Sequence, residues 1–170
     1  MTILEVHNLK KVYTTRFGGN QVQALRNIQF SVEEGEYVAI MGESGSGKTT
    51  LLNILAALDR PTEGEVLLNG KNLVTVREKE IAAFRREHLG FVFQDFALWP
   101  HMTVFENVAF GLRAAGKTDK LDEKVKNALH AVQLDDFAQR YPHQLSGGQQ
   151  QRVAFARAIV IEPACILFDE

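Results

Sequence analysis

The sequence has little cysteine and no long apolar run, and each shortage excludes a class of protein. Cys165 is the only cysteine among 170 residues, so a disulfide framework cannot form. Cys165 lies inside an apolar run, where a small buried hydrophobic residue is expected more than a reactive thiol. No apolar run approaches the ~18 residues of a membrane span, and the N-terminal stretch MTILEVHNLKKVY lacks the features of a signal peptide. We therefore expect a cytoplasmic protein, which would need a membrane-spanning partner if it works at a membrane.

The sequence also lacks an excess of charge of either sign. Its 19 Lys and Arg residues and 21 Asp and Glu residues give a formal net charge of -2. No nucleic acid is expected as a partner, because a basic surface is the usual requirement for that interaction. Mixed runs such as REKE (77–80) and RREH (85–88) favour a solvated face. With 45% apolar and 24% charged residues, the composition is that of a soluble globular domain, with room for a small insert.

Apolar patterning predicts strands and helices in alternation. Short alternating or continuous apolar runs predict strands at residues 3–9, 27–36, 36–42, 65–71, 89–94 and 164–170. The run EVLLNGK, residues 65–71, leads into a predicted Asn-Gly turn. Apolar residues at helical spacing predict helices at residues 48–58, 104–116, 121–134 and 148–160, and the segment DRPTEG, with Pro61, ends the first of them. We therefore expect an α/β core of residues 1–93 and 155–170, with a helical insert at 94–154.

The segment GESGSGKT, residues 42–49, fits the phosphate-loop pattern GxxxxGK[ST] between a predicted strand and a predicted helix. The glycines let backbone N–H groups turn inward around phosphate oxygens, and the helix N-terminus adds its positive end. Lys48 would reach the β- and γ-phosphates, and the Thr49 hydroxyl would bind Mg²⁺. The alternative is a Gly/Ser-rich turn at a helix start, which the strand and helix on either side disfavour. The loop alone does not identify the reaction, because kinases, GTPases and motor ATPases share it.

The segment CILFDE places two carboxylates at the end of a predicted buried strand. Asp169 could hold magnesium through water, and Glu170 could orient or deprotonate an attacking water. A strand that ends in a solvated acidic turn is an equally good interpretation of this segment alone. The phosphate loop in the same chain favours the catalytic interpretation.

The segment LSGGQ, residues 145–149, begins the helix that contains Arg152 and Arg157. Ser146 followed three residues later by Gln149 is a capping box. A helix N-terminus with a serine hydroxyl and two glycines is also an anion site, and could receive a γ-phosphate. The two interpretations are compatible.

In combination, GESGSGKTT, Gln94 after a buried strand, LSGGQQQR and ILFDE closely resemble the nucleotide-binding subunits of ABC transporters, over essentially the whole chain. The resemblance implies a P-loop NTPase core with an N-terminal antiparallel β subdomain and an inserted α-helical subdomain. It implies catalytic roles for Lys48, Gln94 and Glu170, and Mg²⁺ binding by Thr49, Gln94 and Asp169. It also implies that ATP is bound by Tyr13, Gly42, Ser44, Gly45, Ser46, Gly47, Lys48, Thr49, Thr50, Ser146, Gly147, Gly148 and Gln149.

Several of these roles have an alternative. Tyr13 resembles the aromatic residue that stacks on adenine, although it could be a core or surface tyrosine. Gln94 resembles the glutamine that touches magnesium and the attacking water and couples the site to the membrane subunits. The segment DFALWPHMTVFENV, with Phe96 and Trp99, resembles the region that docks on transmembrane partners. Packing inside the helical insert would also explain these aromatic residues.

The resemblance implies a peripheral protein on the cytoplasmic face of the cell membrane, which works with transmembrane permease subunits. A second nucleotide-binding subunit, in a homodimer or heterodimer, would pair head to tail so that the phosphate loop of one and LSGGQ of the other sandwich ATP. ATP would close the dimer, and hydrolysis would reopen it. None of the five histidines has metal-ligand spacing to Cys or acidic residues, so we assign none to a metal.

The sequence departs from the family pattern in two ways. It ends at the acidic pair, so we expect a C-terminally truncated chain with an incomplete sheet and turnover far below that of a complete subunit. An ATP-binding module with little turnover, and a soluble ABC-type ATPase unrelated to transport, remain alternatives. In addition, AALDRPTEGEVLLNGKNL resembles lipoprotein and antimicrobial-peptide exporters, whereas FALWPHMTVFENVAFGLR resembles sugar, polyamine or metal importers. A natural intermediate and an engineered chimera would both explain the mixture.

Overall fold

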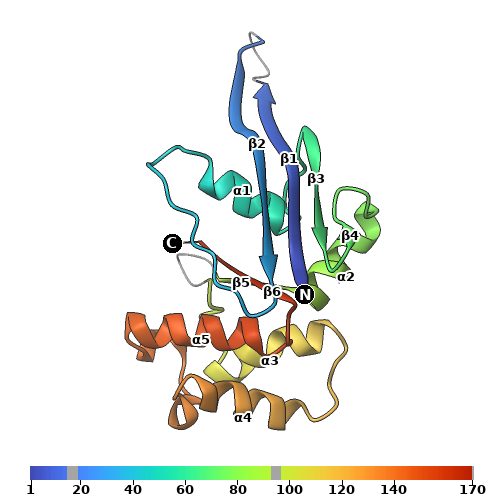
Figure 1. Ribbon diagram of the computed structural model, residues 1–170. Coiled ribbons are helices and arrows are strands. Elements are labelled where there is room, and N and C mark those ends of the chain that lie inside the picture. The colour runs from blue at the N-terminus through green and yellow to red at the C-terminus, as the bar shows by residue number, and fades with distance from the viewer. Residues whose placement is uncertain (15–18, 93–96, 170) are drawn as a thin grey trace. The chain divides into compact units, whose positions relative to one another are not determined.

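The computed structural model describes residues 1–14, 19–92 and 97–169 (Figure 1). The chain divides into two compact units, Met1–Ala82 and Ala83–Glu170. In the part of the chain described, no helix has the length and apolar character needed to cross a membrane.

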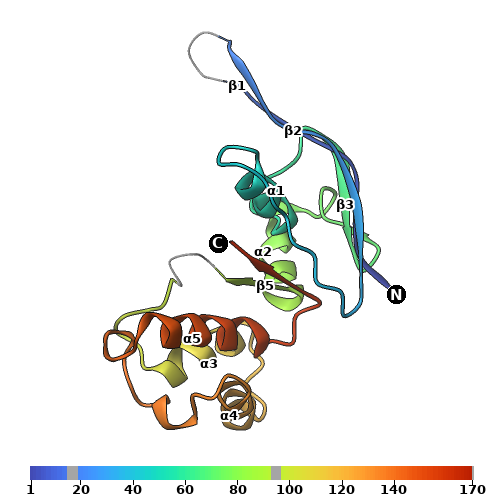
Figure 2. The ribbon, with the colours of Figure 1, turned by 60° about the vertical axis from the view of Figure 1, so that its left-hand side comes forward.

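The first unit is built on an antiparallel sheet with the strand order β2-β1-β3-β4. Its strands are β1 (Thr2–Thr14), β2 (Gln21–Glu33), β3 (Glu63–Leu68) and β4 (Lys71–Asn72). One face is buried, and its side chains come from three strands: Leu4, Val6, Leu9, Leu25, Val66 and Leu68. The predicted N-terminal antiparallel sheet is therefore confirmed. The hairpin formed by β1 and β2 extends beyond β3, whose pairing with β1 ends at Lys10 and Glu63 (Figure 2).

The turn between β3 and β4 is determined by two adjacent residues, so the sequence alone was sufficient to predict it. Asn69 and Gly70 both have positive φ, +48° and +74°. A two-residue turn with positive φ at both positions has a twist that matches the strands on either side, and Asn-Gly is the pair that favours it. The Asn-Gly turn predicted from the sequence is confirmed.

Helix α1 (Lys48–Leu55) follows the glycine-rich loop and turns its apolar side inward, burying Leu51, Leu52, Ile54 and Leu55. The strand predicted at residues 36–42 is wrong, because this segment forms no ladder with any described strand. Tyr37 and Met41 in it are 99% and 88% exposed. An apolar run becomes a strand only when neighbouring strands accept its hydrogen bonds, and no described strand pairs with it.

Helix α2 (Glu78–His88) was not predicted, although it contains RREH (85–88) and the last three residues of REKE (77–80), the two mixed-charge runs expected to form a solvated face. Phe84 is its one buried residue, and the others are exposed or half-buried. The helix begins with Glu78 and Glu80 and ends with basic residues, which complements the helix dipole at both ends. Charge placement supports this helix, and the missing apolar stripe explains why periodicity did not reveal it.

The second unit combines a parallel strand pair with helices. β5 (Leu89–Val92) pairs in parallel with β6 (Cys165–Phe168). Between them lie α3 (Val104–Ala114), α4 (Leu121–Ala131), α5 (Gly147–Ile159) and the short 3-10 helices η1 (Asp135–Phe137) and η2 (Pro142–Gln144). These confirm the three predicted helices and the two predicted strands within the described residues. Parallel strands need such a long crossover connection.

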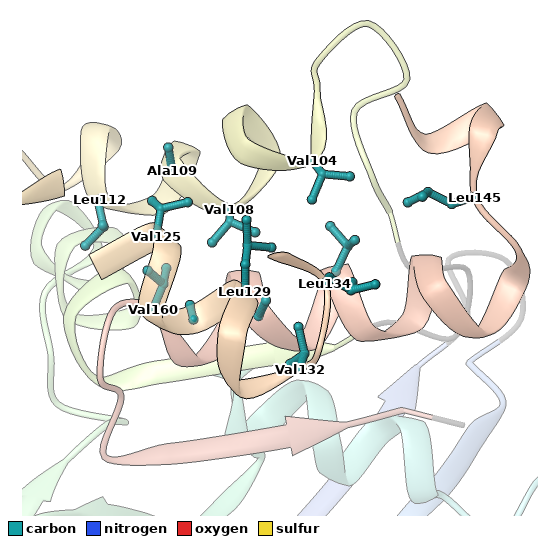
Figure 3. Packing of buried hydrophobic residues seen from close by; sticks show 13 residues of the cluster. Val104, Val108, Ala109, Leu112, Val125, Leu129, Val132, Leu134, Leu145 and Val160 are labelled. Carbon is teal, nitrogen blue, oxygen red and sulfur yellow. The ribbon is translucent and has the colours of Figure 1, made fainter. Parts of the chain in front are cut away.

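The three α-helices of the second unit share one apolar core (Figure 3). Its members recur at helical spacing and are fully or almost fully buried; they include Val104, Val108, Leu112, Val125, Leu129, Val153, Ala156 and Val160. Gly90 in β5 lies against the same helical layer, because a Cβ there would come within 3.2 Å of the Ala158 carbonyl oxygen in α5. The half-buried Cys165 begins β6, and burial raises the pKa of its thiol, which favours the unreactive protonated form.

Candidate functional site

The predicted phosphate loop, residues 42–49, is shaped by two left-handed glycines. Gly45 and Gly47 have φ values of +81° and +93°, which residues with a side chain rarely adopt. The Ser46 N–H donates to the Glu43 carbonyl oxygen at 3.2 Å and closes a turn inside the loop. A Cβ on Gly47 would lie 2.5 Å from the Ala24 carbonyl oxygen of β2. Gly47 therefore serves both the curvature of the loop and its close approach to the sheet.

The N-terminus of α1 differs from those of the other described α-helices. Helices α3 and α5 begin with capping boxes, and α2 and α4 carry acidic residues in their first turns. Among the described α-helices, α1 alone has neither a side-chain cap nor an acidic residue in its first turn. The first N–H groups of a helix need acceptors, and the positive end of the helix dipole attracts anions. This helix start is therefore suited to an anionic ligand such as a phosphate.

The side chain of Lys48, the first residue of α1, folds back over the phosphate loop. Its Nζ donates to the carbonyl oxygens of Gly42 at 2.7 Å and Glu43 at 2.8 Å, and lies 3.5 Å from Ser46 Oγ. These acceptors are neutral, so an anionic phosphate oxygen would be a stronger partner for the ammonium group. The adjacent Thr49 is exposed. Its hydroxyl is an oxygen donor of the kind that Mg²⁺ prefers.

The remaining loop residues assigned to nucleotide binding also lie on the surface. Ser44 is exposed, and Thr50, in the first turn of α1, is half-buried. A Cβ on Gly42 would lie 2.7 Å from Ser46 Oγ, so the glycine leaves the space that the serine hydroxyl occupies. The structure therefore brings residues 42–50 together in one compact loop and helix start.

Tyr13 lies near the end of β1 in a cluster of polar side chains. Its hydroxyl donates to Asp59 Oδ2 at 2.8 Å, and Lys11 Nζ lies 4.8 Å from the ring centroid. Burial and the hydrogen bond to Asp59 raise the pKa of Tyr13, against an opposite effect of a hydrogen bond with Thr50. The ring is 43% exposed, so it is neither a core residue nor free in solvent. The Asp59 N–H in turn donates to the Asn53 carbonyl oxygen of α1 at 3.2 Å, so Tyr13 lies beside the helix that carries the phosphate loop.

The signature segment LSGGQ begins α5 with a closed capping box. Ser146 Oγ accepts a hydrogen bond from the Gln149 N–H at 3.3 Å, and Gln149 Oε1 accepts one from the Ser146 N–H at 2.9 Å. The predicted capping box is confirmed. Gly147 and Gly148 are exposed, and a Cβ on either would meet nothing within 4 Å. Because the Ser146 hydroxyl acts as the acceptor in the box, its own proton stays available to a ligand.

Asp169 follows β6 at the carboxyl edge of the parallel strand pair. Its N–H donates to the Val92 carbonyl oxygen at 3.0 Å, so it lies beside the last residue of β5. In open parallel sheets, ligands bind outside the carboxyl ends of the strands, which is the edge that Asp169 occupies. Glu170 and Gln94 lie outside the described residues, and their roles stay predictions. In the described ranges, no group of three or more His, Cys, Asp or Glu side chains could hold a metal ion.

The predicted docking segment is organised by Asn107, which is fully buried in α3. Its Nδ2 donates to the carbonyl oxygens of Trp99, Met102 and Thr103 at 3.0–3.1 Å, and its Oδ1 accepts from the Trp99 N–H at 2.8 Å. Trp99 is 43% exposed and lies 5.7 Å from Phe110, between ring centroids. Asn107 thus fixes the backbone that carries the Trp99 ring. Phe96 lies outside the described residues.

Two of these positions were missed by the sequence analysis. Asp59 follows the predicted helix in DRPTEG, a segment that indicated only a helix end. Asn107 occupies an inward position of the apolar pattern in VFENVAF, and a polar residue at such a position was the available signal. The partners of Asp59 could not be inferred from spacing, because they lie 48 and 46 positions away in the sequence. Those of Asn107 lie 4 to 8 positions away, but they depend on how the chain before α3 folds back onto that helix.

Comparisons with known sequences and with solved structures lead to the same protein family. A family model described as "ABC transporter" matches residues 25–170. The sulfate/thiosulfate import ATP-binding protein of Bradyrhizobium diazoefficiens is 50% identical over 175 residues, covering 100% of this chain and 47% of that protein. The bacitracin export ATP-binding protein of Halalkalibacterium halodurans is 42% identical over 171 residues, covering 100% of this chain and 67% of that protein. The relatives thus include import and export proteins, in agreement with the mixed resemblance of the two segments.

The comparison with solved structures agrees with the sequence comparisons. A dimeric structure of a post-hydrolysis state of an ATP-binding cassette, bound to ADP and Pi, matches with a TM-score of 0.86 and 40% sequence identity. The match covers 99% of this chain and 74% of that one. This confirms the predicted α/β fold with its antiparallel sheet and helices. The chain spans about half the length of the sulfate/thiosulfate import relatives it matches.

Proposed function

The chain belongs to the ABC transporter family, and from that premise we propose that it is the ATP-binding and ATP-hydrolysing subunit of a transporter, peripheral on the cytoplasmic face of the membrane. The observation that carries the proposal is the start of α1. Its glycine-rich loop, its first turn without acidic residues and the Lys48 ammonium group together favour a polyphosphate. Relatives named as ATP-binding proteins supply the class of nucleotide.

In the proposed complex, ATP lies along the first unit. The backbone N–H groups of residues 42–49 surround the phosphates, and Lys48 exchanges its carbonyl partners for β- and γ-phosphate oxygens. Tyr13 stacks on the adenine base. Its exposed ring beside α1 supports this role.

We assign Mg²⁺ to Thr49, Gln94 and Asp169. The Thr49 hydroxyl and the Asp169 carboxylate are hard oxygen ligands, which fits this ion. The ion supplies charge neutralisation at the phosphates when bound. Glu170 orients or deprotonates the attacking water in this proposal, and Gln94 touches the same water.

Head-to-tail pairing with a second nucleotide-binding subunit would bring LSGGQ of the partner to the γ-phosphate. The closed capping box supports this role, because Ser146 keeps a proton to donate while Gln149 completes the helix start. The related cassette bound to ADP and Pi is dimeric. Permease subunits would dock on the segment DFALWPHMTVFENV, in which Trp99 is 43% exposed and its backbone is held by Asn107.

The proposal is tested by ATP binding to Lys48→Ala, measured by calorimetry with Mg²⁺ present. Loss of a charge-assisted hydrogen bond to phosphate should weaken ATP binding roughly 10- to 100-fold. Lys126→Ala, which removes an exposed lysine from α4, is the matched control and should bind ATP like the wild type. Equal affinities of the two variants would refute the phosphate-loop assignment.

A further inference from the structure

Residues 59–62, here called the strap, lie along β1 where β3 no longer covers it. The β1 and β3 pairing ends at Lys10 and Glu63. Beyond that point, the Thr62 N–H donates to the Lys10 carbonyl oxygen at 2.8 Å, and Thr62 Oγ1 accepts from the Val12 N–H at 3.0 Å. The strap therefore supplies the edge hydrogen bonds that a strand would otherwise provide.

Asp59, the first residue of the strap, joins two side chains of β1. Its Oδ2 accepts from the Tyr13 hydroxyl at 2.8 Å, and its Oδ1 accepts from Lys11 Nζ and from the Arg60 N–H, each at 2.7 Å. Lys11 and Tyr13 are two residues apart on a strand, so their side chains project from the same face. The Lys11 side chain is only 12% exposed and also donates to the Arg60 carbonyl oxygen at 2.7 Å.

Asp59 is in turn fixed to the helix of the phosphate loop. Ala57, with φ of +54°, turns the chain at the end of α1. The N–H groups of Leu58 and Asp59 then both donate to the Asn53 carbonyl oxygen, at 2.8 and 3.2 Å. A continuous set of hydrogen bonds therefore runs from α1 through Asp59 to the Tyr13 ring.

The two charges around Tyr13 have different effects on the ring. The Asp59 carboxylate holds the hydroxyl and so limits rotation of the ring about the β1 backbone. The Lys11 ammonium group lies 4.8 Å from the ring centroid and occupies one face. A base can then stack on the opposite face alone.

We propose that Asp59 is a positioning residue, which holds the Tyr13 ring at a fixed place relative to the phosphate loop and, through Lys11, leaves one face for the base of a nucleotide. This inference rests on the proposed ATP binding, and it adds a residue that does not itself touch the nucleotide. It predicts that Asp59 contributes to recognition of the base and not to recognition of the phosphates.

Both ends of the hydrogen bond between Tyr13 and Asp59 are in the right protonation state at neutral pH. Burial and the carboxylate raise the pKa of the Tyr13 hydroxyl, which keeps its proton. Burial acts to raise the pKa of Asp59, but the hydrogen bonds from Lys11, Tyr13 and the Arg60 N–H outweigh it, and the pKa is lowered. The carboxylate therefore stays ionised as an acceptor.

The test compares ATP with inorganic tripolyphosphate, which has the phosphates but no base, by calorimetry on the 170-residue chain with Mg²⁺. Asp59→Asn should raise the Kd for ATP about fivefold, the lower end of what a base gains from an aromatic stack, and leave the Kd for tripolyphosphate unchanged. Tyr13→Phe keeps the ring and the Lys11 pair, and its Kd for ATP should lie between those of Asp59→Asn and the wild type. Thr62→Val, which disturbs the strap away from the ring, should bind both ligands like the wild type.

The proposal on Asp59 fails if Asp59→Asn and Tyr13→Phe bind ATP as the wild type does, or if they weaken tripolyphosphate as much as ATP. If Asp59→Asn does not fold, as judged by circular dichroism, Tyr13→Phe alone decides by the same criterion. Tyr13→Ala distinguishes the proposed adenine site from the proposed positioning role of Asp59. If it leaves ATP affinity unchanged, the adenine site itself is wrong; if it weakens ATP while the Asp59 variant does not, only the positioning role is wrong.

Discussion

The starts of α1 and α5 are both assigned to phosphate, yet they are built in opposite ways. The start of α5 satisfies its own backbone, because Ser146 and Gln149 exchange hydrogen bonds. The start of α1 has no such cap among the described residues, and Lys48 rests on loop carbonyl groups. The difference teaches that one helix start depends on a ligand to complete it, whereas the other is complete before a ligand arrives.

The largest expected effect comes from Gly47, which forms the uncapped start of α1. Gly47→Ala forces a side chain into left-handed backbone and places its Cβ against the Ala24 carbonyl oxygen. We expect the free energy of unfolding to fall by about 2–4 kcal/mol in chemical denaturation. Gly45→Ala is the control, since it has the same sign of φ and nothing within 4 Å of the new Cβ, and should lose about 1 kcal/mol. Equal losses would mean that the close approach to β2 is unimportant.

A smaller effect is expected at the capped start of α5. Ser146→Ala removes one half of the capping box and should lower the free energy of unfolding by about 1 kcal/mol. Thr103→Ala removes the same element from α3 and should lower it equally. The two variants should differ in ATP-dependent dimerisation, measured by light scattering, where only Ser146→Ala is impaired. Equal dimerisation would leave the signature serine with a capping role alone.

The smallest effect distinguishes the two capping boxes by pH. The box of α3 is closed by Glu106, whose pKa is lowered by hydrogen bonds from the Thr103 N–H and hydroxyl, while that of α5 is closed by the neutral Gln149. A lowered folded-state pKa means that the contribution of Glu106 to stability is present above its ordinary value of 4.5 and is lost as the pH falls through the lowered value. The NMR shift of the Thr103 amide proton should therefore show an inflection below pH 4.5.

The matched observation is the amide proton of Ser146, which should show no inflection from its own box, because an amide side chain does not titrate in this range. Glu106→Gln should abolish the inflection at Thr103 and leave Ser146 as it was. An inflection at Thr103 that survives this substitution would show that another group is responsible.

The sequence predicted the elements whose signals are local. The Asn-Gly turn, the Ser146 capping box and the apolar stripes of α3, α4 and α5 depend on residues within one or two turns of each other, and all were confirmed. The strand predicted at residues 36–42 was wrong, because a strand depends on partners elsewhere in the chain and the apolar run does not specify them.

Side-chain networks show the same limit within the candidate site. Asp59 accepts hydrogen bonds from Lys11 and Tyr13, which lie 48 and 46 positions earlier in the sequence. No periodic pattern connects residues so far apart, and their meeting depends on how the strap closes along β1. The residues of the phosphate loop were easier to identify, because a single turn of chain contains them all.

The hydrogen bonds of the buried Asn107 side chain have a mechanical consequence. The two N–H hydrogens of the Asn107 amide are shared among three carbonyl oxygens, and its Oδ1 accepts one further hydrogen bond, so several contacts join the Trp99–Thr103 backbone to α3. Such a joint is stiff, and it moves with the helix to which it is attached. Since α3 packs on α5 through a common apolar core, we expect a displacement of the Trp99 segment to move the helix that begins with the signature segment as well.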